Sequence, residues 1–358
     1  MNIVQIFPGM IWGGAEQYVL DLGLHLIEQG HNTTFVAIDN PQLRECLSNI
    51  DNVYFIKFRI FGIFNHRILF ELKNILKDAD VIHIHDFRFL PYVCKAKGKT
   101  SKLIVTRHIA KGNITLPWNR KYFKNIHRLI FVSDLAKTLW INKNSWYNKE
   151  KCTVIHNSIP DNAPIPSNNA SLRKVYNISQ SDTLLVYSGR VRKSKGCENI
   201  IYALSKLKEC HFQMIFIGTP KPTNYYCKLM SIASKNGIDN KIHFYSFTKH
   251  VRSLICEADI GLAPSIVREA CPLSPMEFMQ QGICVITSNN GAQSEYIKSG
   301  FNGILINPKS EEELASAIKK LILDSGYRKS LAQNAKDFFW GQMKYSLFIS
   351  KITDLYNN

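Results

Sequence analysis

The feature that most constrains the fold is a regular alternation of short β-branched segments with longer amphipathic segments along the 358 residues. Short apolar runs are typical of buried strands, and apolar residues at three- and four-residue spacing are typical of helices. Strands that alternate with helices form parallel sheets with helices on both faces. The predicted strands are 3–7, 33–37, 53–58, 81–85, 103–106, 129–132, 153–156, 184–188, 213–217, 242–245, 260–263, 285–287 and 303–306.

The alternation is interrupted once, at residues 157–169. Residues 157–167 contain three prolines and no apolar period, which is typical of a linker. The chain length suits two domains of roughly 150–200 residues. We therefore predict an α/β fold of two Rossmann-like, doubly wound parallel-sheet domains, residues 1–160 and 161–333. The segment 334–358 is helical and apolar-rich, and we expect it to cross back to the first domain.

Cysteine usage and hydropathy predict a cytoplasmic protein. The nine cysteines are scattered and form no C-x-x-C pair, which fits reduced thiols better than disulfides or a zinc site. The first residues are strand-like and uncharged, unlike a signal peptide. No apolar run approaches the roughly 20 residues of a spanning helix.

The formal net charge is +17, and the positive charge is concentrated between Arg88 and Arg128. This basic region holds eleven Lys or Arg and no Asp or Glu. It predicts attraction to phosphates of an anionic lipid, a lipid-linked molecule or a nucleic acid. Within it, aromatic and apolar residues recur at helical spacing over 116–130. That helix either packs on its own sheet or lies on the anionic inner face of the cytoplasmic membrane, and the two can coexist.

Gly13, Gly14 and Glu16 belong to a Gly-Gly-Ala-Glu sequence that follows the first strand and opens a helix. Paired glycines let backbone N–H groups approach a ligand, and a helix N-terminus favours an anion. The sequence is not the G-x-G-x-x-G fingerprint of dinucleotide-binding proteins, which argues against a dehydrogenase.

Two cations surround the turn after the first strand of the second half. Gly189-Arg190 ends that strand and Lys195 opens the next helix. Arg190 with its planar fork and Lys195 with its compact charge are suited to clamping a diphosphate. Solvated charges on a loop are the alternative, since Arg192 and Lys193 lie between them.

Two carboxylates, Glu269 and Glu277, flank the start of a predicted helix over 272–281. Free N–H groups at a helix start favour a phosphate, and Glu277 is placed to reach ribose hydroxyls. The motif lies beyond a strand's carboxyl end, where open α/β sheets bind ligands.

His83 and His85 lie two residues apart on a predicted strand, so they face the same side and are able to share a metal ion. No further ligand cluster accompanies them. We therefore expect no metal, and we expect His85 to line a cleft.

Taken together in this order, the motifs resemble glycosyltransferase family 4, the group 1 glycosyltransferases with the two-domain GT-B fold. The resemblance also covers Thr106-Arg107-His108. It implies that Arg190 and Lys195 neutralise a leaving diphosphate, that Glu277 holds the ribose, that Glu269 lies by the transferred sugar, and that His108 reaches this sugar from the first domain. It further implies nucleotide-sugar contacts from Gly13, Gly14, Gly189, Gly218, Leu273 and Ser274, and an acceptor side formed by His85 and Glu16.

The expected function is retaining, metal-independent transfer of a sugar in a cleft between the domains, without a cofactor. The expected donor is a nucleotide-diphosphate sugar, with UDP as the nucleotide. The acceptor is a glycan or a lipid-linked molecule in cell-surface polysaccharide or lipopolysaccharide synthesis. A nucleotide-sugar epimerase on the same fold is the alternative. A nucleic-acid partner is not expected, because neither an aromatic sheet face nor helix-turn-helix spacing is evident.

Overall fold

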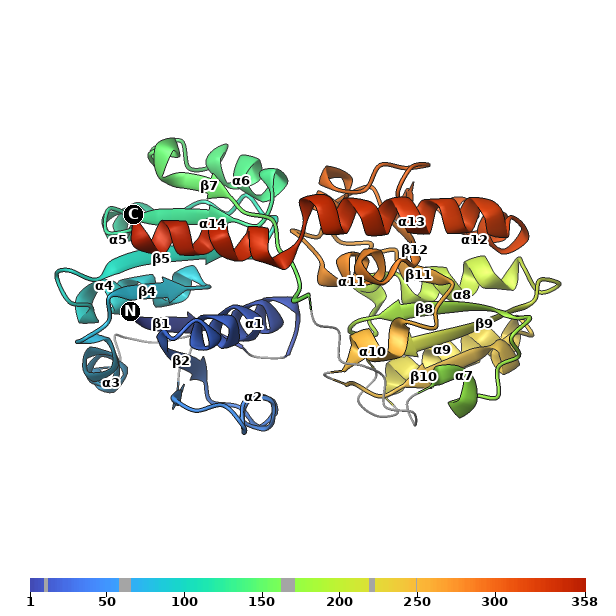
Figure 1. Ribbon diagram of the computed structural model, residues 1–358, viewed down its shortest axis with the longest axis horizontal. Helices are drawn as coiled ribbons and strands as arrows, with labels where there is room; N and C mark the ends of the chain where they lie inside the picture. The colour runs from blue at the N-terminus through green and yellow to red at the C-terminus, as the bar shows by residue number, and fades with distance from the viewer. Residues whose placement is uncertain (10–11, 58–65, 162–170, 219–222, 249) are drawn as a thin grey trace. The chain divides into compact units, whose positions relative to one another are not determined.

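The computed structural model describes residues 1–9, 12–57, 66–161, 171–218, 223–248 and 250–358. The chain forms two compact units, each described by itself. The N-terminal unit comprises Met1–Asn157 and Ser346–Asn358, and the C-terminal unit comprises Ser158–Tyr345 (Figure 1). Most of the predicted linker, residues 162–169, lies outside the described residues.

Each unit is built on one entirely parallel sheet, which confirms the predicted fold class. The first sheet has the order β3-β2-β1-β4-β5-β6-β7 and the second the order β10-β9-β8-β11-β12-β13. Their strands are β1 Asn2–Phe7, β2 Asn32–Ile38, β3 Val53–Ile56, β4 Val81–Ile84, β5 Lys102–Arg107, β6 Arg128–Phe131, β7 Cys152–Val154, β8 Thr183–Ser188, β9 Phe212–Ile217, β10 Ile242–Tyr245, β11 Ile260–Ala263, β12 Cys284–Ser288 and β13 Ile304–Ile306. Every predicted strand is present, with ends within two residues of the prediction. The last residue of predicted strand 53–58, Phe58, lies outside the described residues.

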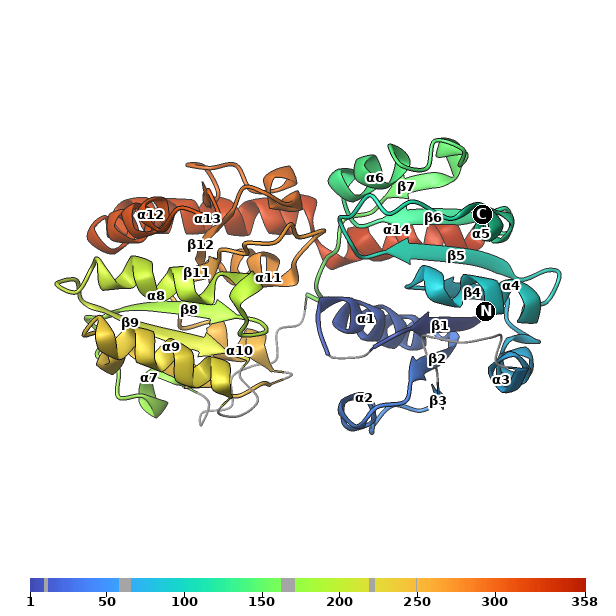
Figure 2. The ribbon, with the colours of Figure 1, turned by 180° about the vertical axis from the view of Figure 1, so that it is seen from behind.

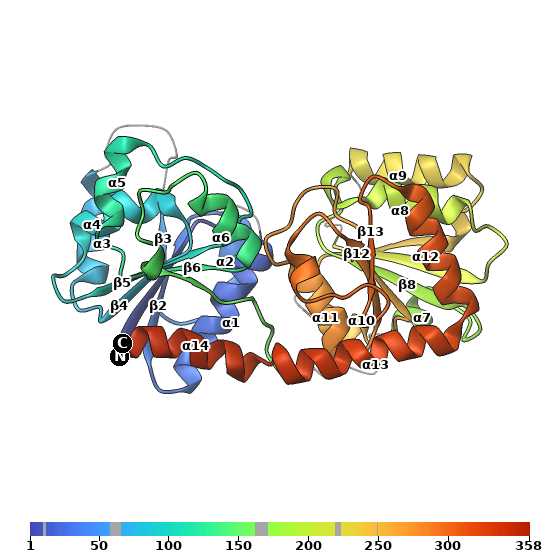
Figure 3. The ribbon, with the colours of Figure 1, turned by 90° about the horizontal axis from the view of Figure 1, so that it is seen from above.

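Helices cover both faces of the N-terminal sheet (Figure 3). They are α1 Gly14–Glu28, α2 Pro41–Cys46, α3 His66–Leu76, α4 Leu90–Ala96, α5 Pro117–Phe123, α6 Asp134–Ile141 and α14 Tyr345–Asn357. One core joins strand residues such as Val4 and Ile82 to Leu72 of α3 and Trp140 of α6. Helices α1 and α14 lie on the opposite face (Figure 3).

The C-terminal sheet is covered in the same way. Its helices are α7 Leu172–Val175, α8 Cys197–Ser205, α9 Asn224–Lys235, α10 Val251–Ile255, α11 Leu273–Gln281, α12 Glu311–Leu323 and α13 Ser325–Gln342. Helix α8 lies between α9 and α12 on one face, and α11 packs on α13 on the other (Figures 2 and 3).

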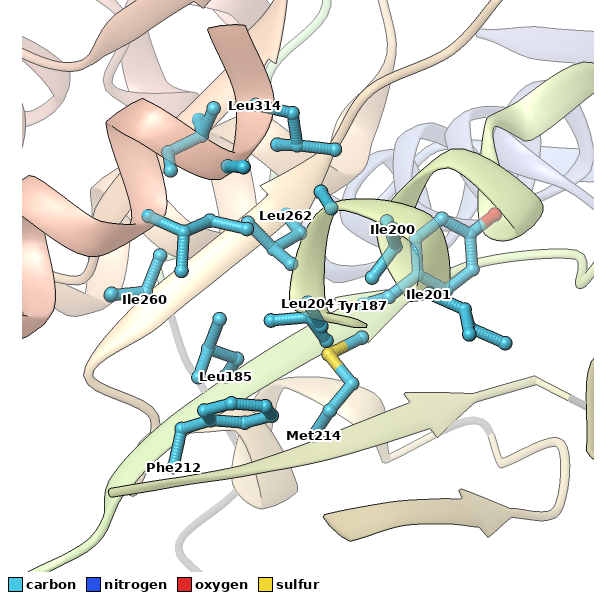
Figure 4. Close-up of a cluster of buried hydrophobic side chains, with 14 of the residues drawn as sticks. Leu185, Tyr187, Ile200, Ile201, Leu204, Phe212, Met214, Ile260, Leu262 and Leu314 are labelled. Carbon is cyan, nitrogen blue, oxygen red and sulfur yellow. The ribbon is translucent and has the colours of Figure 1, made fainter. Parts of the chain in front are cut away.

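The core under α8 shows why these segments fold together (Figure 4). Leu185 and Leu262 project from adjacent strands against Leu204 of α8 and Leu314 of α12, and all four are fully buried. Removing such a side chain from water stabilises the fold by about 1.5–3 kcal/mol. Continuous apolar strands are what a sheet covered on both faces requires.

The segment predicted to return to the first domain, 334–358, begins too early. Residues 325–342 form one helix, α13, in the C-terminal unit, because Leu331, Ala335 and Phe339 are buried at helical spacing. Only residues from Ser346 onwards belong to the N-terminal unit.

The predicted helix over 116–130 is also wrong in its second half. Helix α5 ends at Phe123, and Leu129 and Ile130 belong to strand β6. Leu129 pairs with Val105 of β5 and is fully buried. Pairing and burial in the sheet therefore override the helical spacing. None of the described helices is long and apolar enough to cross a bilayer.

Candidate functional site

The candidate residues flank the point in each sheet where the strand order reverses. Strand β1 has β2 on one side and β4 on the other, and β8 has β9 and β11. Ligands of open α/β sheets bind at such switch points, outside the carboxyl ends of the strands. Gly13 follows β1 and His85 follows β4, while Arg190 follows β8 and Glu269 follows β11.

In the C-terminal unit, the loops after β8 and β11 are held together by close backbone contacts. Gly196, the N-cap of α8, has a φ of +78°, and a Cβ there would lie 2.1 Å from the carbonyl oxygen of Pro264. The amides of Ile266 and Val267 donate to the carbonyl of Ser194 at 3.0 and 3.2 Å. Only glycine fits this position, because it needs both a left-handed backbone and the missing Cβ.

We expect Gly196→Ala to destabilise the C-terminal unit far more than Gly237→Ala. Both glycines have a left-handed φ, +78° and +66°, so both variants lose about 1–2 kcal/mol to backbone strain. Only at Gly196 does the new Cβ meet backbone, since nothing lies within 4 Å at Gly237. Urea unfolding of the two variants measures the difference, and equal losses would contradict the contact.

That contact brings Lys195 and Glu269 together. Lys195 Nζ lies 2.5 Å from Glu269 Oε1, and the Ser265 hydroxyl donates to the same oxygen at 2.6 Å. The two charged side chains are 24% and 17% exposed, so water still reaches the pair. Sequence analysis assigned Lys195 to a leaving diphosphate and Glu269 to the transferred sugar, whereas the structure shows the two side chains in direct contact.

Arg190 precedes this pair in the same loop. It is exposed, and its guanidinium has no hydrogen-bond or ion-pair partner in the part of the chain that the structure describes. Gly189 and Gly218 pack on one another, because a Cβ on Gly218, whose φ is +119°, would lie 2.2 Å from the Gly189 carbonyl oxygen. Gly218 thus has a packing role, and its contact with a nucleotide stays a prediction. The next residue of its loop, Thr219, lies outside the described residues.

Helix α11 begins at Leu273 with Pro272 as its N-cap, and no side chain caps it. The backbone amides of Leu273 and Ser274 have no acceptor among the described residues. The positive end of the helix is thus available to an anion. Glu277 lies one turn further on and is 9% exposed. Its assigned ribose contact stays a prediction.

In the N-terminal unit, the glycine pair opens a helix as predicted. Helix α1 starts at Gly14 with Gly13 as its N-cap and without a side-chain cap. Glu16 lies in its first turn and lines a cavity of about 500 Å³. His85 and His108 line the same cavity, so the structure brings these three candidates together.

Buried polar side chains that begin at the cavity wall form a continuous series of hydrogen bonds, called here the polar chain. His85 contacts His108 at 3.0 Å through Nδ1 and Gln5 Oε1 at 2.8 Å through Nε2. The Gln5 amide donates to the Tyr356 hydroxyl of α14 at 3.1 Å. That hydroxyl lies 2.7 Å from His83 Nδ1, whose Nε2 lies 2.7 Å from the Thr106 hydroxyl; Thr106 is fully buried.

The hydrogen bonds of the polar chain are relevant to the hypothesis that His83 and His85 share a metal ion. The two rings do lie on the same side, with centroids 4.2 Å apart. Both ring nitrogens of each, however, are engaged by protein groups. The pair is thus a hydrogen-bonded structural element.

The three histidines joined by these hydrogen bonds, His83, His85 and His108, are neutral at pH 7. Burial lowers the pKa of His83 to about 3 and that of His108 to about 4, and it places the pKa of His85 well below its ordinary value. Neighbouring histidines lower the pKa values of His83 and His85 further, while Asp86 partly opposes the effect on His108.

Because the three imidazole rings are neutral, the donor and the acceptor of each hydrogen bond in the polar chain can be assigned. Because Gln5 Oε1 only accepts, His85 Nε2 carries the proton and His85 Nδ1 accepts from His108 Nε2. The remaining nitrogen of His108, Nδ1, is left as an acceptor, suited to a hydroxyl group of a ligand.

We expect the stability of the N-terminal unit to fall as the pH drops below about 6.5. An unfolded histidine binds a proton there, whereas the three folded ones do not until the pH nears their lowered pKa values. Each histidine then lowers the free energy of unfolding by up to about 1.4 kcal/mol for each pH unit. Urea unfolding followed by tryptophan fluorescence reports this unit, because it holds Trp12, Trp118, Trp140 and Trp146 of the five tryptophans. His108→Asn should shrink the pH dependence, and a flat profile between pH 7.5 and 5 would contradict the assignment.

Sequence analysis did not predict the roles of several members of both clusters. Gln5 was not considered, and His83 and Thr106 were named but not assigned to a hydrogen-bonded series, although polar residues within largely apolar strands are a readable signal for a buried polar layer. Ser265 and Tyr356 gave none, because only folding brings them to Glu269 and His83.

Two units, each built on one parallel sheet, are the architecture of GT-B glycosyltransferases. Solved structures of such enzymes share this fold. A crystal structure of Anabaena Alr3699/HepE in complex with UDP and glucose has a TM-score of 0.83 and 18% identity, covering 99% of this chain and 98% of that chain. The lipopolysaccharide biosynthesis glycosyltransferase WaaG has a TM-score of 0.71 and 18% identity, covering 99% of both.

Family models give the assignment. The model of glycosyltransferase family 4 matches residues 12–162, and that of glycosyl transferases group 1 matches residues 168–338. The chain therefore belongs to the group 1 and family 4 glycosyltransferases. N-acetyl-alpha-D-glucosaminyl L-malate synthase of Bacillus anthracis is 22% identical over 96% of this chain and 93% of that relative. Lipopolysaccharide glucosyltransferase WaaG of Escherichia coli is 30% identical over 51% of this chain and 49% of its own length.

Proposed function

We propose that this glycosyltransferase transfers a sugar from a UDP-sugar, with retention and without a metal, to a glycan or lipid-linked acceptor of cell-surface polysaccharide or lipopolysaccharide. The observation that carries the proposal is the contact of Lys195 with Glu269 at the switch point of the C-terminal unit. Arg190 lies five residues before Lys195 in the same loop.

The charges match what the reaction must stabilise. Breaking the anomeric bond develops positive charge on the sugar and negative charge on the departing diphosphate. Arg190, Lys195 and the amides of Leu273 and Ser274 are fixed positive groups for that diphosphate. Glu269, held by Lys195 and Ser265, is placed to orient hydroxyls of the transferred sugar.

Similar proteins support the choice of nucleotide and pathway in this proposal. The Anabaena protein was solved with UDP and glucose, and the two WaaG matches belong to lipopolysaccharide synthesis. On the acceptor side we assign Glu16 and His85, which share the cavity of the N-terminal unit with His108. In this proposal His108 Nδ1 accepts a hydrogen bond from a hydroxyl of the transferred sugar.

Retention implies that the acceptor attacks from the side of the leaving group, with the departing phosphate taking its proton. The anomeric configuration of the product, read by NMR, tests this. Full activity in EDTA tests metal independence, since Arg190 and Lys195 supply the positive charge. An epimerised nucleotide sugar formed without an acceptor would favour the epimerase alternative.

Donor binding is tested by thermal shift with a panel of nucleotides and nucleotide sugars. We expect UDP and UDP-sugars to raise the melting temperature, because a ligand stabilises the state that binds it. Glu277→Ala should abolish the shift, whereas Glu209→Ala, an exposed carboxylate elsewhere in the same unit, should leave it intact. A shift that survives Glu277→Ala would contradict the ribose assignment.

We further propose peripheral attachment to an anionic membrane through the basic region. Trp118 and Ile114 are 65% and 63% exposed, next to Arg120 and Lys121. Aromatic and basic side chains together favour the headgroup layer of anionic lipid. Co-sedimentation with phosphatidylglycerol vesicles should exceed that with phosphatidylcholine, and Trp118→Ser should reduce it. Equal sedimentation with both lipids would refute attachment.

A further inference from the structure

A buried arginine without a carboxylate partner lines the cavity of the N-terminal unit. Arg107, the last residue of β5, is 5% exposed and lines the cavity beside His108. Its Nη2 donates to the Lys111 carbonyl at 2.7 Å, and its guanidinium carbon lies 5.2 Å from the centre of the Phe87 ring. Its Nε is buried and has no hydrogen-bond partner.

The carboxylate near Arg107, that of Asp86, already accepts hydrogen bonds from another arginine, Arg88. Both oxygens of Asp86 accept from the Arg88 guanidinium, at 2.9 and 3.0 Å, and the Arg88 amide donates to the first at 2.8 Å. Arg107 forms no ion pair with a carboxylate anywhere in the described ranges of the chain. Burial lowers the pKa of Arg107 to about 10, an effect that the nearby charge of Asp86 partly opposes, so Arg107 is charged at pH 7. A buried charge that no carboxylate contacts directly costs stability, and such groups are typical of binding sites.

The cavity around Arg107 is preformed. The Asn144 side chain accepts from the Thr115 amide and donates to the Asn113 carbonyl, both at 2.8 Å, which fixes the loop that follows β5. Asn113 and Thr115 line the cavity, as do the apolar side chains of Ile114 and Leu116. A volume of about 500 Å³ is that of a small-molecule site.

We propose that this cavity binds an acceptor that carries a carboxylate or a phosphate, with the Arg107 guanidinium as the counter-ion and the apolar wall against the body of the acceptor. The inference rests on the proposed function, since it names the chemical class of the acceptor. A guanidinium donates two parallel hydrogen bonds to either anion, so the shared feature is the anionic oxygen pair.

Three matched glycosides test the proposal on the full chain: phenyl β-glucoside, phenyl β-glucuronide and phenyl β-glucoside 6-phosphate. They differ at one carbon, which is neutral, a carboxylate or a phosphate. We expect at least one anion to bind about tenfold or more tighter than the neutral glucoside by titration calorimetry, as a charge-assisted contact would give. Whichever of the two binds tighter identifies the source of the anion.

Arg107→Gln should abolish the preference, because glutamine keeps an N–H donor but carries no charge. Arg107→Lys should keep part of it, which covers the case of a glutamine variant that does not fold. Arg120→Gln is the matched control, since Arg120 lies over the Trp146 ring and outside the cavity. Equal binding of the three glycosides, no binding of either anion, or a preference that survives in a folded Arg107→Gln protein would each overturn the proposal. A UDP thermal shift on the same samples separates this failure from failure of the proposed function, because the shift reports the C-terminal unit.

Discussion

Lys195→Ala is expected to lower the rate of sugar transfer by roughly 100-fold or more. Lys195 is one of two cations assigned to the departing diphosphate, and removing one such contact costs about 2.7–4 kcal/mol of barrier. The same change leaves Glu269 without its ion pair, so the carboxylate also loses the group that orients it. Steady-state release of UDP from a donor that the thermal-shift panel selects measures the effect.

Lys193→Ala is the matched control, because Lys193 belongs to the same loop, is exposed and has no assigned role. It should retain the wild-type rate. Since Lys195 acts mainly on the transition state, kcat should fall more than the donor KM rises. An unchanged kcat in Lys195→Ala would remove the observation on which the proposed function rests.

Tyr356→Phe is expected to destabilise the N-terminal unit strongly, although it removes a single oxygen atom. The Tyr356 hydroxyl is the partner of both His83 Nδ1 and the Gln5 amide, and both of these groups are buried. Each group left unsatisfied costs about 1–3 kcal/mol. Urea unfolding read by tryptophan fluorescence reports this unit.

Tyr54→Phe makes the same change at a side chain that is 48% exposed, and it should leave stability unchanged. Tyr356→Phe should also disturb the hydrogen-bond direction at His85 and His108, which the ring nitrogens report by ¹⁵N NMR. A Tyr356→Phe protein as stable as wild type would show that the buried polar chain does not depend on α14.

Much of the fold was readable because its determinants are local. Every strand was predicted from short apolar runs, since a strand covered on both faces must be apolar along its length. The helix over 116–130 failed where two local patterns overlap. Leu129 and Ile130 fit a helical period, but pairing with β5 decided in favour of a strand.

The candidate site was predicted in its residues but not in its contacts. Glycines, cations and carboxylates after strand ends are sequence signals, and parallel strands bring their carboxyl ends to one edge. The ion pair of Lys195 with Glu269 depends on the close approach of Gly196 to Pro264, which joins two loops far apart in sequence.

The sequence by itself determined two parallel sheets, their strands and the residue types at their edges, because periodicity and strand propensity act over a few neighbouring residues. Only the tertiary structure decided that Tyr356 completes a polar chain begun at Gln5, and that Arg107 stays buried without a carboxylate. Those outcomes depend on which side chains are left unsatisfied once separate segments have packed, 351 residues apart in the case of Gln5 and Tyr356, and no local pattern records that balance.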